Sequence, residues 1–312
     1  MLTRCALGPT LAAILFLVLC GCTAGSKPAP TKSDRLVVVS TTGMINDAVR
    51  NIGGEHVEAI GLMGPGIDPH LYRATADDVR KLDDANVIFY SGLELEGRMT
   101  EIFAKMKSRG TPTYPVTAAI ALDQLRSPPE FKGKHDPHVW FDVELWRSVA
   151  GEVRDALAKA DPARQATYQA NADKYLAMLD SLHEYVASEA ASLPADRRVL
   201  VTAHDAFGYF GRKYGFEVAG IQGTSTASEA GARRIIDLAD LIVRRKVKAI
   251  FVETSVPEAT IKALQNAVRD RGWDVNVGGK LYSDAMGDDG TPEGTYEGMV
   301  RHNIDTIVQA LR

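Results

Sequence analysis

Apolar residues along this chain follow two periods that alternate. Short β-branched runs such as Leu36–Val39 and Ala249–Val252 fit strands buried on both faces. Between the runs, apolar residues recur every three or four positions, which is typical of helices with one buried face. The pattern predicts strands at 36–39, 57–62, 87–90, 113–116, 199–202, 216–221, 249–252 and 275–277. It predicts helices at 44–52, 75–82, 93–107, 206–214, 228–245, 257–271 and 300–311, and one that follows 139–142 and ends near 160.

One longer helix, over residues 161–193, interrupts this alternation. Asp161 can cap its first turn, Pro162 suits its first position, and nothing breaks the pattern before Pro194. Its apolar stripe consists of Tyr168, Ala172, Tyr175, Leu179, Leu182 and Val186. At 1.5 Å per residue such a helix is roughly 45 Å long. A surface helix or a short coiled coil is the alternative, but we expect a rigid spine.

Strands that alternate with helices favour parallel sheets covered on both faces. We therefore predict an α/β fold with two lobes, each a parallel sheet flanked by helices, joined by one long backbone helix. The N-terminal α/β lobe would cover 36–160, the inter-lobe helix 161–193 and the C-terminal α/β lobe 194–312.

The first 35 residues do not fit this core. Arg4 precedes an apolar run, Leu11–Leu19, that is too short to span a bilayer and long enough for a signal peptide. The run leads into Leu19-Cys20-Gly21-Cys22, which resembles a bacterial lipobox, so 1–21 is a candidate lipoprotein signal peptide and Cys22 the lipidation site. An ordinary signal peptide is the alternative. Residues 22–35 would then be a flexible tether.

Cysteine and charge narrow the function classes further. All three cysteines lie in this leader, so we expect neither a disulfide framework nor a thiolate metal site. The formal net charge is −4, and Arg4 is the one charged residue of 1–21, so the remainder carries −5. This argues against nucleic acid as a partner.

Four residues are candidate metal ligands: His70, His138, His204 and Asp284. The tripeptide Asp-Pro-His occurs twice, at 68–70 and 136–138, and proline stiffens each loop. His204 and Asp284 follow predicted strands, and ligands of open parallel sheets bind at the carboxyl ends of strands.

Three imidazoles and one carboxylate suit a divalent transition metal. They fill a four-coordinate zinc shell, and a bidentate Asp would give five ligands, which a larger ion such as manganese tolerates. Such a site is built to hold metal rather than to use it, so we do not expect an enzyme. Glu253, Asp142 and Asp205 are candidates for carboxylates that accept the free ring N–H of a ligand histidine.

The segments around these residues resemble a known family. They are GPGIDPHLY (64–72), DPHVWFD (136–142), TAHDAFGYF (202–210) and SDAMG (283–287). They resemble the ligand loops of the metal-binding (cluster A-I) solute-binding proteins of ABC transporters, most closely the TroA type, which binds zinc and manganese. The resemblance covers nearly the whole chain after Leu36. It implies His70, His138, His204 and Asp284 as ligands in the interface between two lobes.

Two departures from the family's subtypes leave the metal open. Zinc-dedicated members often carry a His-rich, acidic loop before the second ligand, whereas residues 125–134 contain no histidine. Many manganese members have Glu at the third position, where this chain has His204. The ion would be Zn²⁺ or Mn²⁺ at one site, carried as cargo.

We therefore expect an extracytoplasmic solute-binding protein, lipid-anchored to the bacterial membrane in the periplasm or at the cell surface. It would be a monomer that delivers its metal to a membrane permease with a cytoplasmic ATPase. With two ligands from each lobe, metal loss should cause a small tilt and local loop movement, since a helical spine resists wide hinge motion. The alternatives are an envelope metallohydrolase using the same site, or a metal-binding surface adhesin.

Overall fold

The structure is a computed structural model that describes residue 2 and residues 34–131, 133–228 and 231–312. The predicted signal peptide over 1–21, the lipidation site Cys22 and nearly all of the tether over 22–35 lie outside the described residues, apart from Leu2, Asp34 and Arg35. None of the helices within the described ranges combines the length and apolarity needed to span a bilayer.

The N-terminal lobe is built on a parallel sheet with the strand order β2-β1-β3-β4. Its strands are β1 Leu36–Ser40, β2 Val57–Gly61, β3 Val87–Tyr90 and β4 Thr113–Pro115. Successive strand residues point to opposite faces. Val38 therefore packs under α1 (Gly43–Gly53) and α4 (Val143–Ala160), whereas Val39 faces α2 (Ala76–Asp83) and α3 (Thr100–Ser108).

The C-terminal lobe repeats this layering with its strands in two parallel pairs, β5–β6 and β7–β8, and β5 lies beside β7. The strands are β5 Val199–His204, β6 Glu217–Gln222, β7 Ala249–Glu253 and β8 Asn276–Leu281. Helices α7 (Ala232–Arg245) and α8 (Ala259–Arg269) cover the outer face with a separate apolar cluster. Helices α6 (Gly208–Tyr214) and α9 (Tyr296–Leu311) lie on the inner face.

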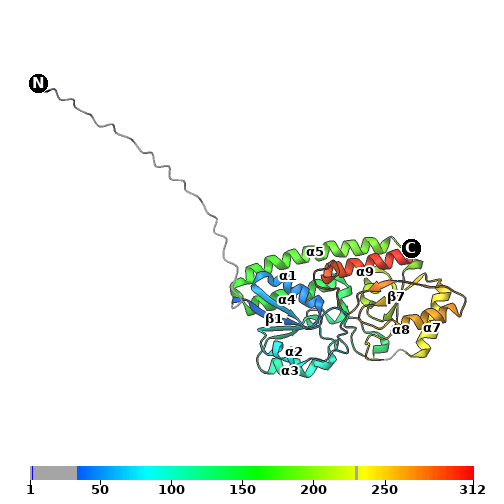
Figure 1. Cartoon of the computed structure of the whole chain (residues 1–312), viewed down its shortest axis with the longest axis horizontal. Coiled ribbons are helices and arrows are strands. Elements are labelled where there is room, and N and C mark those ends of the chain that lie inside the picture. Colours follow the sequence, from blue (N-terminus) through cyan, green and yellow to red (C-terminus); the bar gives the residue numbers. More distant parts are fainter. Residues whose placement is uncertain (1, 3–33, 132, 229–230) are drawn as a thin grey trace.

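The predicted spine is helix α5, Gln165–Ala191, which runs along both lobes with α9 beside it (Figure 1). Its buried residues are Tyr168, Ala172, Tyr175, Leu179, Leu182, Val186 and Ala190, the predicted stripe with one further member. These residues join one apolar cluster that contains side chains of both sheets, so the lobes share a core under α5. The two-lobed α/β architecture is thus confirmed, while the boundaries at 160/161 and 193/194 stay predictions.

Several element starts differ from the sequence-based prediction. The helix predicted at 93–107 begins only at Thr100, because Leu93 and Glu94 have φ values of 52° and 64°, outside the helical region. Residues Pro162–Arg164 form a 3₁₀ turn before α5 rather than its first α-helical turn. Strand β8 continues through Gly278 and Gly279 to Leu281, beyond the predicted end at 277, with a bulge in its pairing opposite Ile250 and Phe251.

Candidate metal centre

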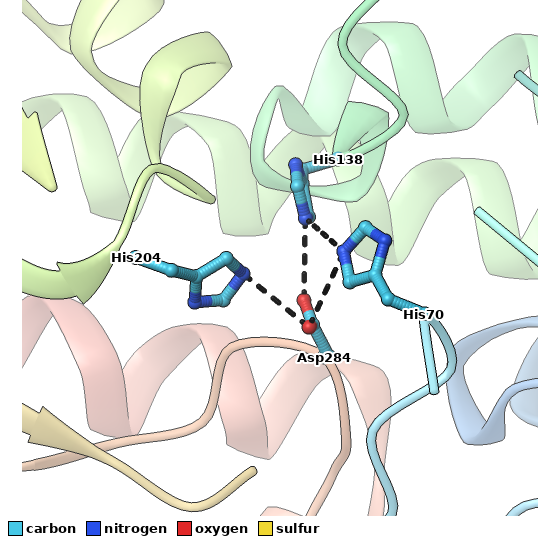
Figure 2. Close-up of side chains that lie close together, drawn as sticks. All are labelled: His70, His138, His204 and Asp284. Carbon is cyan, nitrogen blue, oxygen red and sulfur yellow. Dashed lines mark hydrogen bonds and ion pairs between the residues drawn. The ribbon is translucent and has the colours of Figure 1, made fainter. Parts of the chain in front are cut away.

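The four predicted ligands meet between the two lobes (Figure 2). His70 lies in the loop after β2, and His138 directly precedes the 3₁₀ turn Val139–Phe141 that leads into α4. His204 is the last residue of β5, and Asp284 follows β8 by three residues. Strand ends thus place two of the ligands directly, and irregular loops place the other two.

The ligand atoms of these residues all lie within 4.8 Å of one another. The Nε2 atoms of His70 and His138 are 3.3 Å apart. The carboxylate of Asp284 lies between the three rings, with Oδ1 3.4 Å from His138 Nε2 and Oδ2 3.3 Å from His204 Nε2 and 3.7 Å from His70 Nε2 (Figure 2). One small ion between these atoms would reach all four side chains.

Burial makes this arrangement costly without an ion. His138 and His204 are completely buried, and Asp284 is 2% exposed. Both carboxylate oxygens of Asp284 and the Nε2 atom of His204 lack a hydrogen-bond partner within the described residues. Buried polar atoms are normally hydrogen-bonded, so unpaired ones that converge on one point require an explanation. A divalent cation supplies one, since imidazole nitrogen and carboxylate oxygen are ligands of zinc and manganese.

Electrostatics within the cluster favour a lone pair at His70. Burial and the neighbouring histidines lower the pKa of His70 to about 3, so its ring is neutral at physiological pH. Burial opposes the charge on Asp284, but His204 and His138 outweigh it and hold the pKa of Asp284 well below its usual range. Burial also opposes a charge on the other two rings, but Asp136 and Asp284 raise the pKa of His138 to about 9, and Glu253 and Asp284 raise that of His204. Ligands must be deprotonated to bind a metal, so an ion that binds here would displace the protons held by these two rings.

Two carboxylates bind the ring nitrogens of His204 and His138 that face away from the centre. Glu253, at the end of β7, accepts hydrogen bonds from Nδ1 of His204 (2.5 Å) and from its backbone N–H (2.8 Å). Asp136 likewise accepts from Nδ1 of His138 (2.7 Å) and from its backbone N–H (3.0 Å). Each contact leaves Nε2 facing the centre, as the second partner of a ligating imidazole does in metal sites.

The other two carboxylates suggested by the sequence lie elsewhere. Asp142 accepts the backbone N–H groups of Glu144 and Leu145, so it caps α4. Asp205 follows β5, and burial together with the nearby Asp136 raises its pKa.

Sequence reasoning missed Asp136 and its partner Arg126, whose guanidinium binds the second carboxylate oxygen of Asp136. The repeated Asp-Pro-His tripeptide was a usable signal for Asp136, because the aspartate stands two residues before a ligand candidate both times. Nothing near Arg126 in the sequence marks it as the partner of Asp136, which lies ten residues later.

Comparisons with known proteins find a matching family and similar proteins. Residues 38–310 match the family described as zinc-uptake complex component A, periplasmic. The chain is 52% identical over 292 residues to the "Zinc-binding protein TroA" of Treponema pallidum, covering 92% of each chain. It is 46% identical over 306 residues to the "Manganese-binding lipoprotein MntA" of Bacillus subtilis, covering 97% of this chain and 98% of that one.

A solved structure supports the same assignment. The structure of the periplasmic zinc-binding protein TroA of Treponema pallidum superposes with a TM-score of 0.86 at 52% identity, over 89% of this chain and 99% of that one. The family match and these relatives span nearly the whole described chain. The protein therefore belongs to the family of zinc-uptake complex component A, the periplasmic metal-binding proteins.

Proposed function

We propose that this protein captures a divalent transition metal, Zn²⁺ or Mn²⁺, outside the cytoplasmic membrane and delivers it to an ABC-type importer. His70, His138, His204 and Asp284 hold the ion, while Glu253 and Asp136 orient two of the rings. The partner is a membrane permease with its cytoplasmic ATPase. Lipid on Cys22 anchors the monomeric protein to the membrane. The names of the relatives, a zinc-binding protein and a manganese-binding lipoprotein, support this role.

The observation that carries the proposal is the set of unpaired, buried ligand atoms at the lobe boundary. Four protein ligands complete a tetrahedral zinc shell, whereas catalytic zinc sites keep a position open for water. Asp284 has two oxygens facing the centre, so bidentate coordination would also suit manganese. The arrangement favours binding and release of an ion over hydrolysis at it.

The choice between zinc and manganese depends on more than the ligand set. Nitrogen-rich sites bind zinc more tightly than manganese by the Irving–Williams order. Relatives at 52% and 46% identity carry a zinc-binding and a manganese-binding name. We therefore expect this centre to accept both ions, with metal supply outside the cell deciding which one is carried.

A buffered-metal titration of the metal-stripped protein tests the proposal. We expect tight binding of both ions, and Asp284→Ala should weaken each by at least about 100-fold because three imidazoles alone leave the shell incomplete. The matched control is Asp289→Ala, which removes an exposed carboxylate five residues along the same loop. Unchanged affinity in Asp284→Ala would refute the ligand assignment, and weak binding by the unmodified protein would refute the function.

A further inference from the structure

The loop that carries His138 is fastened to the C-terminal lobe, although it belongs by sequence to the N-terminal one. The indole N–H of Trp140 donates to the backbone oxygen of Ser283 (3.0 Å), next to Asp284. The hydroxyl of Tyr296, on α9, donates to the backbone oxygen of Trp140 (2.7 Å). These bonds tie His138 to the segment that carries Asp284.

Three more contacts come from α6 and from Phe207, the residue before it. The hydroxyl of Tyr209 donates to the backbone oxygen of Asp136 (2.9 Å) and accepts the backbone N–H of Arg126 (3.0 Å). The rings of Phe141 and Phe207 stack with centroids 4.3 Å apart. His138, His204 and Asp284 therefore lie in one tightly bonded block under α5.

The segment 64–70, which carries His70, is held differently. Before it, the backbone N–H of Met63 donates to Thr41 in the N-terminal lobe (3.0 Å). After it, Arg98 donates to the backbone oxygen of Leu71 (2.9 Å) and Tyr72 donates to Asp78 (2.7 Å), again in the N-terminal lobe. These anchors lie directly after β1, in the 3₁₀ turn before α3 and on α2, so segment 64–70 is held at both ends by the N-terminal lobe.

One side-chain hydrogen bond links the middle of this segment to the C-terminal lobe, as far as the described residues show. The hydroxyl of Thr226, four residues after β6, donates to Oδ2 of Asp68 (2.6 Å). Oδ1 of the same carboxylate accepts the backbone N–H of His70 (2.9 Å). Asp68 thus couples a contact across the lobe boundary to the backbone of one ligand.

The surroundings of the segment leave it room to move. A cavity of about 100 Å³ lies between Gly64 and Pro65 on one side and Met286 and Gly287 on the other. No atom outside its neighbours would contact a Cβ placed on Gly64. Ile67 is 38% exposed, so an apolar side chain in the middle of the segment gains little from its present position.

We propose that the four ligands divide three to one, and that His70 is the ligand that leaves and returns. The Asp68–Thr226 hydrogen bond is the latch that holds His70 on the metal, so both are positioning residues for metal exchange. Release then needs segment 64–70 to swing aside, while the block of His138, His204 and Asp284 stays assembled. This inference rests on the proposed function, and it sharpens the expected small tilt with loop movement into a movement of one loop.

The latch makes a kinetic prediction. Thr226→Val removes the hydroxyl but keeps a β-branched side chain. Zinc release from the loaded protein into excess chelator should become about tenfold faster, because His70 loses the contact that holds it in place. Thr226→Ser keeps the hydroxyl and should release zinc within about twofold of the unmodified rate. Ser225→Ala is the matched control, since its hydroxyl accepts only the local N–H of Ala227 among the described residues (3.3 Å).

The outcomes separate the latch from the function itself. If the unmodified protein binds zinc tightly and Thr226→Val releases it at the unmodified rate, the latch is refuted while the metal site stands. Equal acceleration in Thr226→Val and Ser225→Ala would also refute it, because a general loosening of this loop would then be the cause. Absence of tight zinc binding in the unmodified protein would refute the proposed function instead.

Trp140 reports independently on which block moves. The chain has three tryptophans, so 5-fluorotryptophan labelling gives three resonances that Trp→Phe variants can assign. If only segment 64–70 moves, metal removal leaves Trp140 as protected from a soluble paramagnetic agent as before. If the lobes part between His138 and Asp284, Trp140 loses Ser283 and becomes broadened like the half-buried Trp273, which would overturn the three-to-one division.

Discussion

The two Asp-Pro-His tripeptides of this protein form the same local turn and are held in different ways. In each, the aspartate Oδ1 accepts the backbone N–H of the histidine two residues later, at 2.9 Å for Asp68 and 3.0 Å for Asp136. Such a turn is common for aspartate, and the proline between the two residues stiffens it. The local sequence therefore aims each histidine in a similar manner.

The second carboxylate oxygen distinguishes the two tripeptides. In Asp136 it binds the guanidinium of Arg126, and the whole aspartate is buried. In Asp68 it accepts the hydroxyl of Thr226, a neutral partner from the other lobe, at a partly exposed position. The contact of Asp136 joins two opposite charges, whereas only the acceptor is charged in the contact of Asp68, so we expect the first to be the stronger. We therefore expect the tripeptide at 136–138 to hold His138 in a fixed position, and the tripeptide at 68–70 to allow His70 to move.

Replacing each aspartate by alanine should separate these two roles most clearly. Asp136→Ala leaves the Arg126 guanidinium and the buried His138 ring without their partner, which costs about 3 kcal/mol of unfolding free energy. It should also weaken zinc binding by about 10- to 100-fold. Asp68→Ala should cost about 1 kcal/mol and act mainly on the rate of zinc release. Urea unfolding of the metal-free variants and zinc titration measure both, and equal stability losses would contradict the comparison.

A substitution at Gly208 can weaken the contact between Arg126 and Asp136 without changing either residue. A Cβ at this first residue of α6 would lie 1.3 Å from Nη1 of Arg126, so Gly208→Ala forces the guanidinium away from Asp136. We expect a loss of about 1–3 kcal/mol in unfolding free energy and zinc affinity lowered by only a few-fold, because Asp136 itself still holds His138.

Gly151→Ala, in α4, is the control for this substitution. Its Cβ would meet no atom within 4 Å, so it should be neutral or stabilising. A loss of stability in Gly151→Ala similar to that in Gly208→Ala would show that the cost does not come from Arg126.

The sequence predicted the strands and helices better than it predicted the residues that position the candidate ligands. Strands such as Val87–Tyr90 were recognisable because both of their faces are buried, and the long helix because its stripe continues without a break. The four candidate ligands, which the structure brings together, were recognisable because they lie in Pro-stiffened loops or after strands. Each of these signals is local in the chain.

Residues such as Thr226 and Tyr209 position the site through contacts with distant segments, and a local sequence pattern does not reveal such contacts. Thr226 is 158 residues from Asp68, and Tyr209 is 73 residues from Asp136. The turn at Leu93 and Glu94 was missed for a related reason. The buried Glu96 closes this turn by accepting the backbone N–H groups of Ser91 and Gly92, and it also accepts the hydroxyl of Thr41, which follows β1.

A substitution at Asp47 tests whether a change in folding stability alone alters the rate of metal release. We expect no change in that rate. Asp47 lies on α1 beneath α5, where the hydroxyl of Tyr175 donates to its carboxylate (3.0 Å). Burial raises the pKa of Asp47 from 3.8 to about 6, against the lowering effect of Tyr175. A raised pKa means that the folded chain binds the proton more tightly, so this contribution favours folding below about pH 4 and is lost as the pH rises through about 6.

Asp47→Asn removes the buried charge, so it should stabilise the metal-free protein at pH 7.5 by up to about 3 kcal/mol, and by almost nothing at pH 4. Unfolding in urea at the two pH values measures this, and stopped-flow chelation measures zinc release at pH 7.5. We expect an unchanged release rate, because Asp47 lies under α5, and Asn51 and Tyr175, whose side chains hydrogen-bond to it, are outside segment 64–70. If release slowed in proportion to the added stability, metal exchange would require opening of the shared core, and the distinction between a fixed and a releasable tripeptide would fail.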